Sequence, residues 1–153
     1  MHDNLTHLDE QGKASMVDVS GKPSMLRTAI AEGFFNAKET TIDALLCGDL
    51  PKGEGLAVAR IAGIQAAKLC DTIIPLCHPL PIEHVEVTFE RVDSGRLKIT
   101  SKVVVTGRTG IEMEASSAVS VAALALWDMT KAIDASLSIS DITLVEKRKE
   151  KLT

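Results

Sequence analysis

The chain has 153 residues and a formal net charge of −4, and 45% of its residues are hydrophobic. This length suits one domain with a sizeable core, and the weakly acidic balance argues against a nucleic-acid-binding protein, which usually carries a basic face. Aromatic residues make up only 3% of the chain, so the core must consist mainly of small aliphatic side chains.

The cysteine pattern indicates a reducing environment. Cys47, Cys70 and Cys77 form no CxxC pair, and their odd number argues against a disulfide framework or a structural zinc site. No signal-peptide pattern opens the chain, and no charge-free apolar run reaches the ~18 residues that a membrane span requires. We therefore expect a cytoplasmic protein without a membrane span.

Three patterned segments follow a polar start. Residues 1–13 are polar and are predicted to be flexible, whereas residues 16–20 alternate as a short edge strand would. Residues 27–35 alternate again and predict a longer strand. Residues 37–50 carry apolar side chains at helical spacing, and Gly48 fits the end of that helix.

The middle of the chain alternates between loops and regular elements. Residues 48–55 are a loop rich in Pro and Gly, and residues 56–71 predict a helix that is apolar around most of its circumference. Three prolines prevent regular structure in residues 73–81. Residues 82–90 alternate strictly and predict a strand, and residues 93–95 form the turn of a hairpin.

The last third completes the fold prediction. It reads as a strand over residues 96–107, the longest helix over residues 110–134, a strand over residues 138–147 and a charged tail, residues 148–153, that we expect to be flexible. The order of elements predicts a single α+β domain over residues 1–153. Its split βαβ pattern packs helices on one face of an antiparallel sheet.

The longest helix carries ionisable groups despite its apolar composition. Asp128 and Lys131 lie near its end, at a spacing that allows them to pair, and they face away from the apolar stripe. They can form an ordinary exposed ion pair, or their face can contact a cleft or a second subunit. The apolar stripe consists of Val119, Ala122, Ala123, Leu126 and Ile133.

Two glutamates stand at the entrance of this helix. Alternation predicts an extended approach, with Glu112 and Glu114 on one side and Met113 on the other. Two neighbouring carboxylates repel each other, so the pKa of one should rise. The alternative is that both simply complement the positive end of the helix dipole.

His78 and Lys52 occupy rigid or glycine-flanked loops. His78 follows Cys77 between prolines, and it can be either a catalytic group or a structural histidine; the two adjacent side chains are poorly arranged to share a metal ion. Lys52 precedes a helix start, where phosphate can bind, although no Walker A motif is present. Together the candidates favour metal-free acid–base chemistry on an anionic small molecule.

Five stretches of the chain closely resemble the molybdenum cofactor biosynthesis protein C family, the cyclic pyranopterin monophosphate synthases. These stretches are MVDVS, PKGE, ARIAGIQAAKLCDTIIPLCHPLPIEHVEV, TGRTGIEMEA and AVSVAALALWDMTKAID. The resemblance implies a ferredoxin-like fold and a homohexamer, a trimer of dimers, with active sites at the dimer interface. It also implies a lyase that converts (8S)-3',8-cyclo-7,8-dihydroguanosine 5'-triphosphate to cyclic pyranopterin monophosphate and pyrophosphate.

The resemblance also assigns functional residues. Asp128 matches the catalytic aspartate, Lys131 the lysine that follows it, and Lys52 the catalytic lysine of the PKGE loop. We expect Asp128 to transfer protons, tuned by burial and by Lys131, and the two lysines to hold the triphosphate. Positions that the family uses to bind the substrate are matched by Leu76, Cys77, His78, Glu112, Met113 and Glu114.

The carboxyl-terminal tail departs from the family pattern, which usually ends in K-S-G-G-K-S-G. Here Lys147 and Lys151 keep the lysine spacing, but both glycines are absent, so we retain only Lys147 as a substrate-binding residue. No cofactor is expected, apart from Mg²⁺ that could accompany the triphosphate. The altered tail leaves two alternatives open: a module that binds nucleotide or pterin without catalysis, and a purely structural oligomer.

Overall fold

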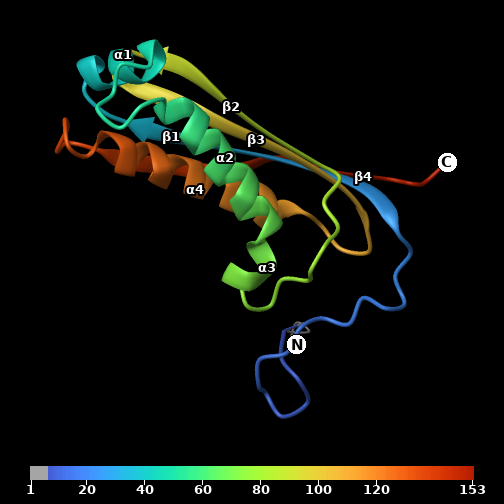
Figure 1. Cartoon of the computed structure of the whole chain (residues 1–153). Helices are drawn as coiled ribbons and strands as arrows, with labels where there is room; N and C mark the ends of the chain where they lie inside the picture. Colours follow the sequence, from blue (N-terminus) through green and yellow to red (C-terminus); the bar gives the residue numbers. More distant parts are fainter. Residues whose placement is uncertain (1–6) are drawn as a thin grey trace.

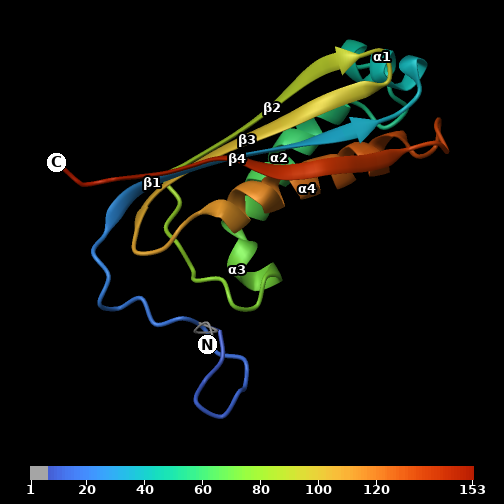
Figure 2. The same cartoon turned by 180° about the vertical axis from the view of Figure 1, so that it is seen from behind.

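Four strands pair into one antiparallel sheet. The computed structural model describes residues 7–153. The strand order is β2-β3-β1-β4, with every neighbouring pair antiparallel, as Figure 2 shows from the side of the sheet. This order confirms the ferredoxin-like α+β fold. The strands are β1 (Met25–Asn36), β2 (His84–Asp93), β3 (Arg96–Gly107) and β4 (Ser138–Glu150).

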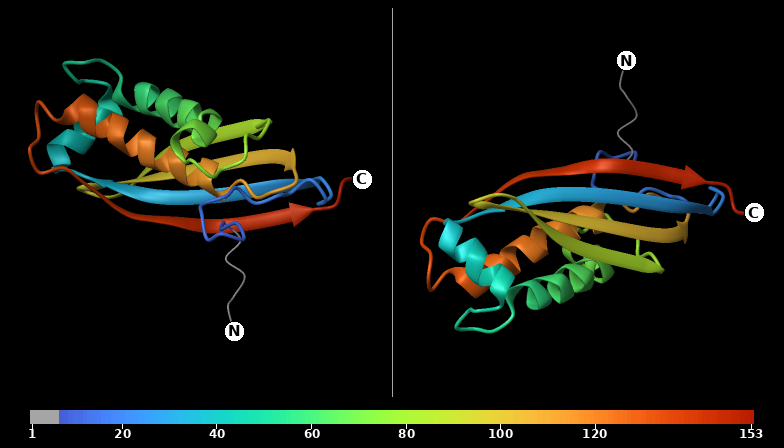
Figure 3. Two further views of the ribbon diagram at one scale, coloured as in Figure 1. Left: turned by 90° about the horizontal axis from the view of Figure 1, so that it is seen from below. Right: turned by 90° about the horizontal axis from the view of Figure 1, so that it is seen from above.

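The helices cover one face of this sheet (Figures 1 and 3). They are α1 (Glu39–Cys47), α2 (Gly55–Lys68), the short α3 (Cys70–Ile73) and α4 (Glu112–Thr130). The main helices, α2 and α4, lie side by side on this face of the sheet.

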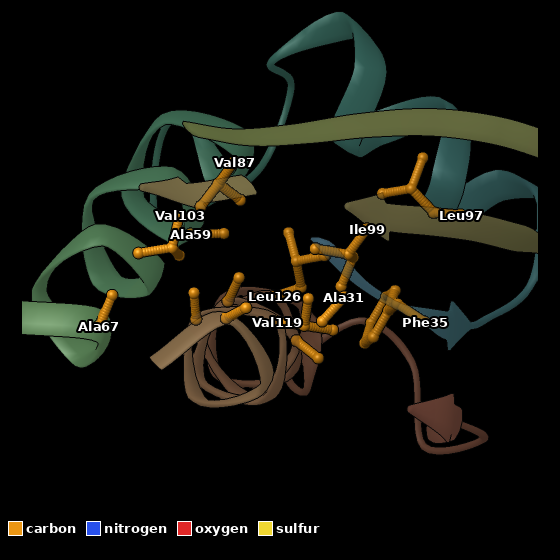
Figure 4. Close-up of a cluster of buried hydrophobic side chains, with 14 of the residues drawn as sticks. Ala31, Phe35, Ala59, Ala67, Val87, Leu97, Ile99, Val103, Val119 and Leu126 are labelled. Carbon is orange, nitrogen blue, oxygen red and sulfur yellow. The ribbon is translucent and has the colours of Figure 1, made fainter. Parts of the chain in front are cut away.

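The core lies between the helices and the sheet (Figure 4). Alternation along β1 turns Ala31 and Phe35 toward the helices, and the side chain of Ile99 in β3 points to the same face. Val119 and Leu126 of α4 pack against them, and all five side chains are fully buried. More than half of the other buried hydrophobic side chains are Ala or Val, as the low aromatic content predicted.

Small residues let α2 and α4 approach closely. A Cβ atom placed on Gly63 of α2 would lie 2.8 Å from the backbone oxygen of Ala118 of α4 and 3.2 Å from the Cβ of Ala122. Only glycine fits this contact without displacing backbone. The crossing therefore fixes α4 against α2 at Ala118 and Ala122.

Most predicted elements are confirmed. The strand predicted over residues 96–107 has the observed bounds of β3, and residues 93–95 form the predicted hairpin turn. Gly48 ends α1 with a φ of 70°, a left-handed conformation that glycine adopts without strain. The proline-rich segment, residues 73–81, contains no strand and only the last residue of α3.

The edge strand predicted over residues 16–20 is wrong. The segment is extended but pairs with no strand. The Asp18 carboxylate accepts a hydrogen bond from the Ser20 amide at 2.8 Å, which turns the chain, and the Val17 carbonyl bonds to a histidine ring. Alternation here therefore reflects a segment that lies with one side against the protein.

The amino-terminal segment is only partly described. Residues 1–6 of the predicted flexible region lie outside the described residues. In the remainder, Leu8 pairs with Ala14 in an isolated bridge, and the Asp9 carboxylate accepts hydrogen bonds from two backbone amides of the intervening turn.

The last helix and the end of the last strand differ from the prediction. Glu112 and Glu114 belong to the first turn of α4 rather than to an extended approach. Ile133 lies beyond the helix and is exposed, so it is not part of the buried stripe. β4 continues through Glu150, because Arg148, Lys149 and Glu150 pair with β1. The prediction that residues 148–153 are flexible is therefore wrong for residues 148–150.

Asp134 holds the loop after α4 to the start of α1. Its buried carboxylate accepts hydrogen bonds from the Lys38 amide at 2.8 Å, the Thr41 hydroxyl at 2.8 Å, and both the amide and the hydroxyl of Ser136. Burial raises the pKa of Asp134, but these hydrogen bonds outweigh it and hold the pKa far below its ordinary value.

We expect Asp134→Ala to lower the free energy of unfolding by about 2–4 kcal/mol at neutral pH, because several buried donors lose their acceptor. A carboxyl group with a depressed pKa stabilises the fold above its ordinary pKa of 3.8 and loses this contribution as the pH falls further. Urea unfolding of both proteins at pH 7 and near pH 3 should therefore show a smaller difference at the lower pH. An unchanged difference would contradict this assignment.

Candidate active site

A cavity of about 460 Å³ lies at the amino-terminal end of α4. Of the seven predicted substrate-binding residues, six line this cavity, and only Lys147 lies outside it. The proline-rich segment, the start of α4 and the extended segment around Val17 form its walls. The lining consists of His7, Val17, Val19, Lys22, Ile74, Leu76, Cys77, His78, Leu80, Thr109, Gly110, Glu112, Met113 and Glu114.

His78 fastens one wall of this cavity to the other. Its ring Nε2 lies 2.6 Å from the backbone oxygen of Val17. A carbonyl oxygen can only accept, so Nε2 carries the proton and donates it, which leaves Nδ1 as the ring atom available to a substrate. The structural and the substrate-binding interpretations of His78 are thus compatible, because Nε2 bonds to the Val17 backbone oxygen and Nδ1 remains available to a substrate.

The two glutamates differ in their acidity. Glu114 is 4% exposed, and burial, helped by the nearby Glu112 charge, raises the pKa of Glu114 above its ordinary value. Burial also acts on Glu112, but the Lys147 ammonium and the Arg27 charge outweigh it and lower the pKa of Glu112. The predicted rise of one pKa is confirmed, although burial rather than repulsion is its main cause.

Cys77 presents a neutral thiol to the cavity. Burial is the main cause that raises the pKa of Cys77, and the Glu114 charge adds to it. Burial likewise raises the pKa of the adjacent Cys70 to about 12. A thiol with a raised pKa is a poor nucleophile, so Cys77 can contact a substrate but is unsuited to covalent catalysis.

A second cleft, of about 520 Å³, adjoins the first and is strongly cationic. Thr109, Gly110 and Lys22 line both cavities, and an ion pair between Lys147 and Glu112 joins one to the other. The lining of the second cleft, which we call the basic cleft, consists of Lys22, Pro23, Met25, Arg27, Arg108, Thr109, Gly110, Lys147 and Lys149.

The sequence predicted Lys147 but none of the other cations of the basic cleft. Within residues 7–153, Lys22, Arg27, Arg108 and Lys149 pair with no carboxylate. They come from distant segments, so no spacing in the sequence joins them. Alternation along β1 could have placed Arg27 on the helix side of the sheet, but which strand lies beside it could not be read. Unpaired cations that converge on one cleft favour a polyanionic ligand.

Lys52, Asp128 and Lys131 form a separate cluster at the other end of α4. Lys131 Nζ lies 2.7 Å from one Asp128 carboxylate oxygen and Lys52 Nζ 3.3 Å from the other; Lys52 also donates to the Asp128 backbone oxygen at 2.9 Å. Hydrogen bonds from Lys131 and then Lys52 lower the pKa of Asp128. The predicted pairing is confirmed, but Asp128 is 58% exposed, so the expected tuning by burial is absent in the single chain.

The two clusters are far apart in one chain. From Glu112 to Asp128 the helix rises about 24 Å, at ~1.5 Å per residue. The helix face beside Asp128 is also unusually apolar for an exposed surface: Leu124 is 56% exposed and Trp127 37%. The structure therefore assembles the cavity and the basic cleft at one end of α4, and it does not bring Lys52, Asp128 and Lys131 to them.

Within residues 7–153, no group of three or more His, Cys, Asp or Glu side chains is arranged to hold a metal ion. Among the same residues, no helix combines the length and the apolar character that crossing a membrane requires. Cys47, Cys70 and Cys77 are all free thiols.

Comparison with known proteins gives a consistent result. The MoaC family model matches residues 16–150. A cyclic pyranopterin monophosphate synthase of Desulfitobacterium hafniense is 51% identical over 143 residues, which cover 94% of this chain and 88% of that protein. Cyclic pyranopterin monophosphate synthase 3 of Mycobacterium bovis is 53% identical over 95% of this chain and 83% of its own length. A synthase of Roseiflexus castenholzii is 51% identical, with coverages of 94% and 92%.

Proposed function

Because the chain belongs to the MoaC family, we propose that it is a cyclic pyranopterin monophosphate synthase, an enzyme of molybdenum cofactor biosynthesis. The observation that carries this function is the pairing of a cavity that contains two carboxylates with a directly adjoining basic cleft. Such a pair of sites fits a ligand that combines a nitrogen-rich ring with a polyphosphate. The free thiols suit a cytoplasmic location.

The substrate we propose is (8S)-3',8-cyclo-7,8-dihydroguanosine 5'-triphosphate, with its ring system in the cavity and its phosphates in the basic cleft. Glu112 and Glu114 offer oxygens to the N–H donors of the guanine-derived ring. The Arg and Lys side chains of the cleft match the negative charge and the geometry of phosphate oxygens. His78 would contact the substrate through Nδ1.

We further propose that the active site is completed by a second copy of the chain. The two clusters lie about 24 Å apart along α4, a distance that one nucleotide cannot bridge while it is held closely at both ends. In this arrangement a partner subunit places the carboxyl-terminal end of its own α4 beside the cavity, so that its Lys52, Asp128 and Lys131 contact the substrate. The same contact covers the exposed side chains of Leu124 and Trp127. A homohexamer built from such dimers, a trimer of dimers, extends this proposal.

In the completed site, Asp128 transfers protons while the guanine-derived ring opens and closes again as a pterin. The cyclic phosphate closes when a substrate hydroxyl attacks the α-phosphorus. Its proton passes to a base, the bond to the β-phosphate oxygen breaks, and pyrophosphate leaves. Lys52 and Lys131 stabilise the charge on the leaving group. We propose no resident cofactor, and Mg²⁺ would enter only with the triphosphate.

A direct turnover assay tests the function. Purified protein incubated with the cyclised GTP derivative should form the pyranopterin and pyrophosphate in equal amounts, and no product should form without protein. Substrate binding without either product would contradict the enzyme and favour a binding module, whereas neither binding nor product would favour a structural oligomer.

A further inference from the structure

The end of β4 places two positive side chains opposite each other. Lys149 is the direct cross-strand partner of Arg27, and Lys147 is the partner of Ala29. Alternation therefore puts Lys147 and Lys149 on the face of the sheet that carries the helices, and both line the basic cleft. Arg148, between them, faces the other way and lies near Glu146 and Glu150.

Arg27 has little freedom to move away from Lys149. Its Nε donates to the Gly107 backbone oxygen at 3.0 Å and its Nη2 to the Arg108 backbone oxygen at 3.2 Å. Arg108 is held in turn, because its Nη1 donates to the Ser20 oxygen at 3.0 Å. Like charges directly opposite in a sheet are destabilising, and no carboxylate of residues 7–153 pairs with Arg27 or Lys149.

We propose that Lys149 is a substrate-binding residue that holds the polyphosphate in the basic cleft together with Arg27 and Lys147. This inference rests on the proposed function. The backbone that carries Lys149 is paired with β1 through Glu150, so the side chain starts from a fixed point beside the cleft before the ligand arrives. An anion bound between Lys149 and Arg27 would be attracted by both side chains, and these attractions would offset the repulsion between the two positive charges.

Lys149→Gln should have opposite effects on the stability of the free protein and on the stabilisation that a bound polyphosphate provides. Lys149→Gln should raise the melting temperature of the free protein slightly, because it removes the repulsion. The same variant should reduce the rise in melting temperature caused by inorganic tripolyphosphate, and it should raise KM for the nucleotide roughly tenfold with kcat changed less than about twofold.

Arg148→Gln is the matched control, because it removes the same charge from the neighbouring residue on the opposite face. It should leave the tripolyphosphate effect and KM as in the wild type. Equal tripolyphosphate shifts in Lys149→Gln and the wild type would overturn the proposal. A wild-type protein that shifts with tripolyphosphate but makes no product would instead contradict the proposed function, while the Lys149 comparison would remain decisive for the cleft.

Discussion

Mixing two inactive variants, Lys52→Ala and Glu112→Ala, should restore turnover. Each substitution damages one of the two clusters, and each alone should reduce kcat/KM at least about 100-fold. We assume that each site combines the cavity of one subunit with the lysine cluster of the other. A mixed dimer then has one site with both substitutions and one site that joins the intact cavity of the Lys52→Ala subunit to the intact lysine cluster of the Glu112→Ala subunit. Random mixing should then recover about a quarter of the wild-type sites, since half of the dimers are mixed and each has one intact site.

The experiment requires mixed oligomers, obtained by co-expression with two different affinity tags and purification on both. Lys52→Ala mixed with Asp128→Ala provides the control, because both changes fall in the same cluster; this mixture should stay inactive. Absence of recovery in verified mixed oligomers of the first pair would place the complete active site within one chain and contradict the proposed assembly.

Asp128→Asn should have the largest effect of any single conservative substitution. It keeps the size of the side chain but removes the proton acceptor, so kcat should fall by about 10²–10⁴-fold. KM should change much less, because the side chains of the cavity and of the basic cleft, rather than Asp128, provide most of the contacts that bind the substrate. Single-turnover kinetics with the purified variant separate the two parameters.

The pH profile provides an independent check on Asp128. Hydrogen bonds from Lys131 and Lys52 hold the pKa of Asp128 below its ordinary value of 3.8, so its carboxylate stays ionised until the pH falls below that value. Lys52→Ala removes one donor and should move the acid limb of kcat/KM for its residual activity upward. An acid limb of kcat/KM that moved to lower pH in Lys52→Ala would contradict the proton-transfer role of Asp128. An acid limb that stayed unchanged in Asp128→Asn would contradict it as well.

The fold was largely predictable because its strands alternate. Residues 96–107 alternate at most positions and follow a clear turn, and β3 has those bounds. The same signal misled at residues 16–20, because alternation shows that one side is covered but not that a strand lies alongside. At Glu112 and Glu114, two-residue spacing suggested an extended segment, although the helix had already begun.

Six residues of the cavity could be predicted from the family resemblance, because they occupy two short motifs, one before β2 and one at the start of α4. The basic cleft could not, because Lys22, Arg108 and Lys149 meet only through the strand register and the hydrogen bonds of the loops. The separation of the two clusters was in principle readable from the length of the helix alone.

The glycine contact between α2 and α4 also constrains how this protein can evolve. A Cβ on Gly63 would meet the Ala118 backbone at 2.8 Å, and one on Gly33 would meet the Val119 side chain at the same distance. Residue 63 therefore has no room for a larger side chain, because the backbone of α4 cannot give way, whereas a larger residue at position 33 would require the Val119 and Ile142 side chains to shift. Lineages that diverge in this enzyme should therefore keep glycine at position 63.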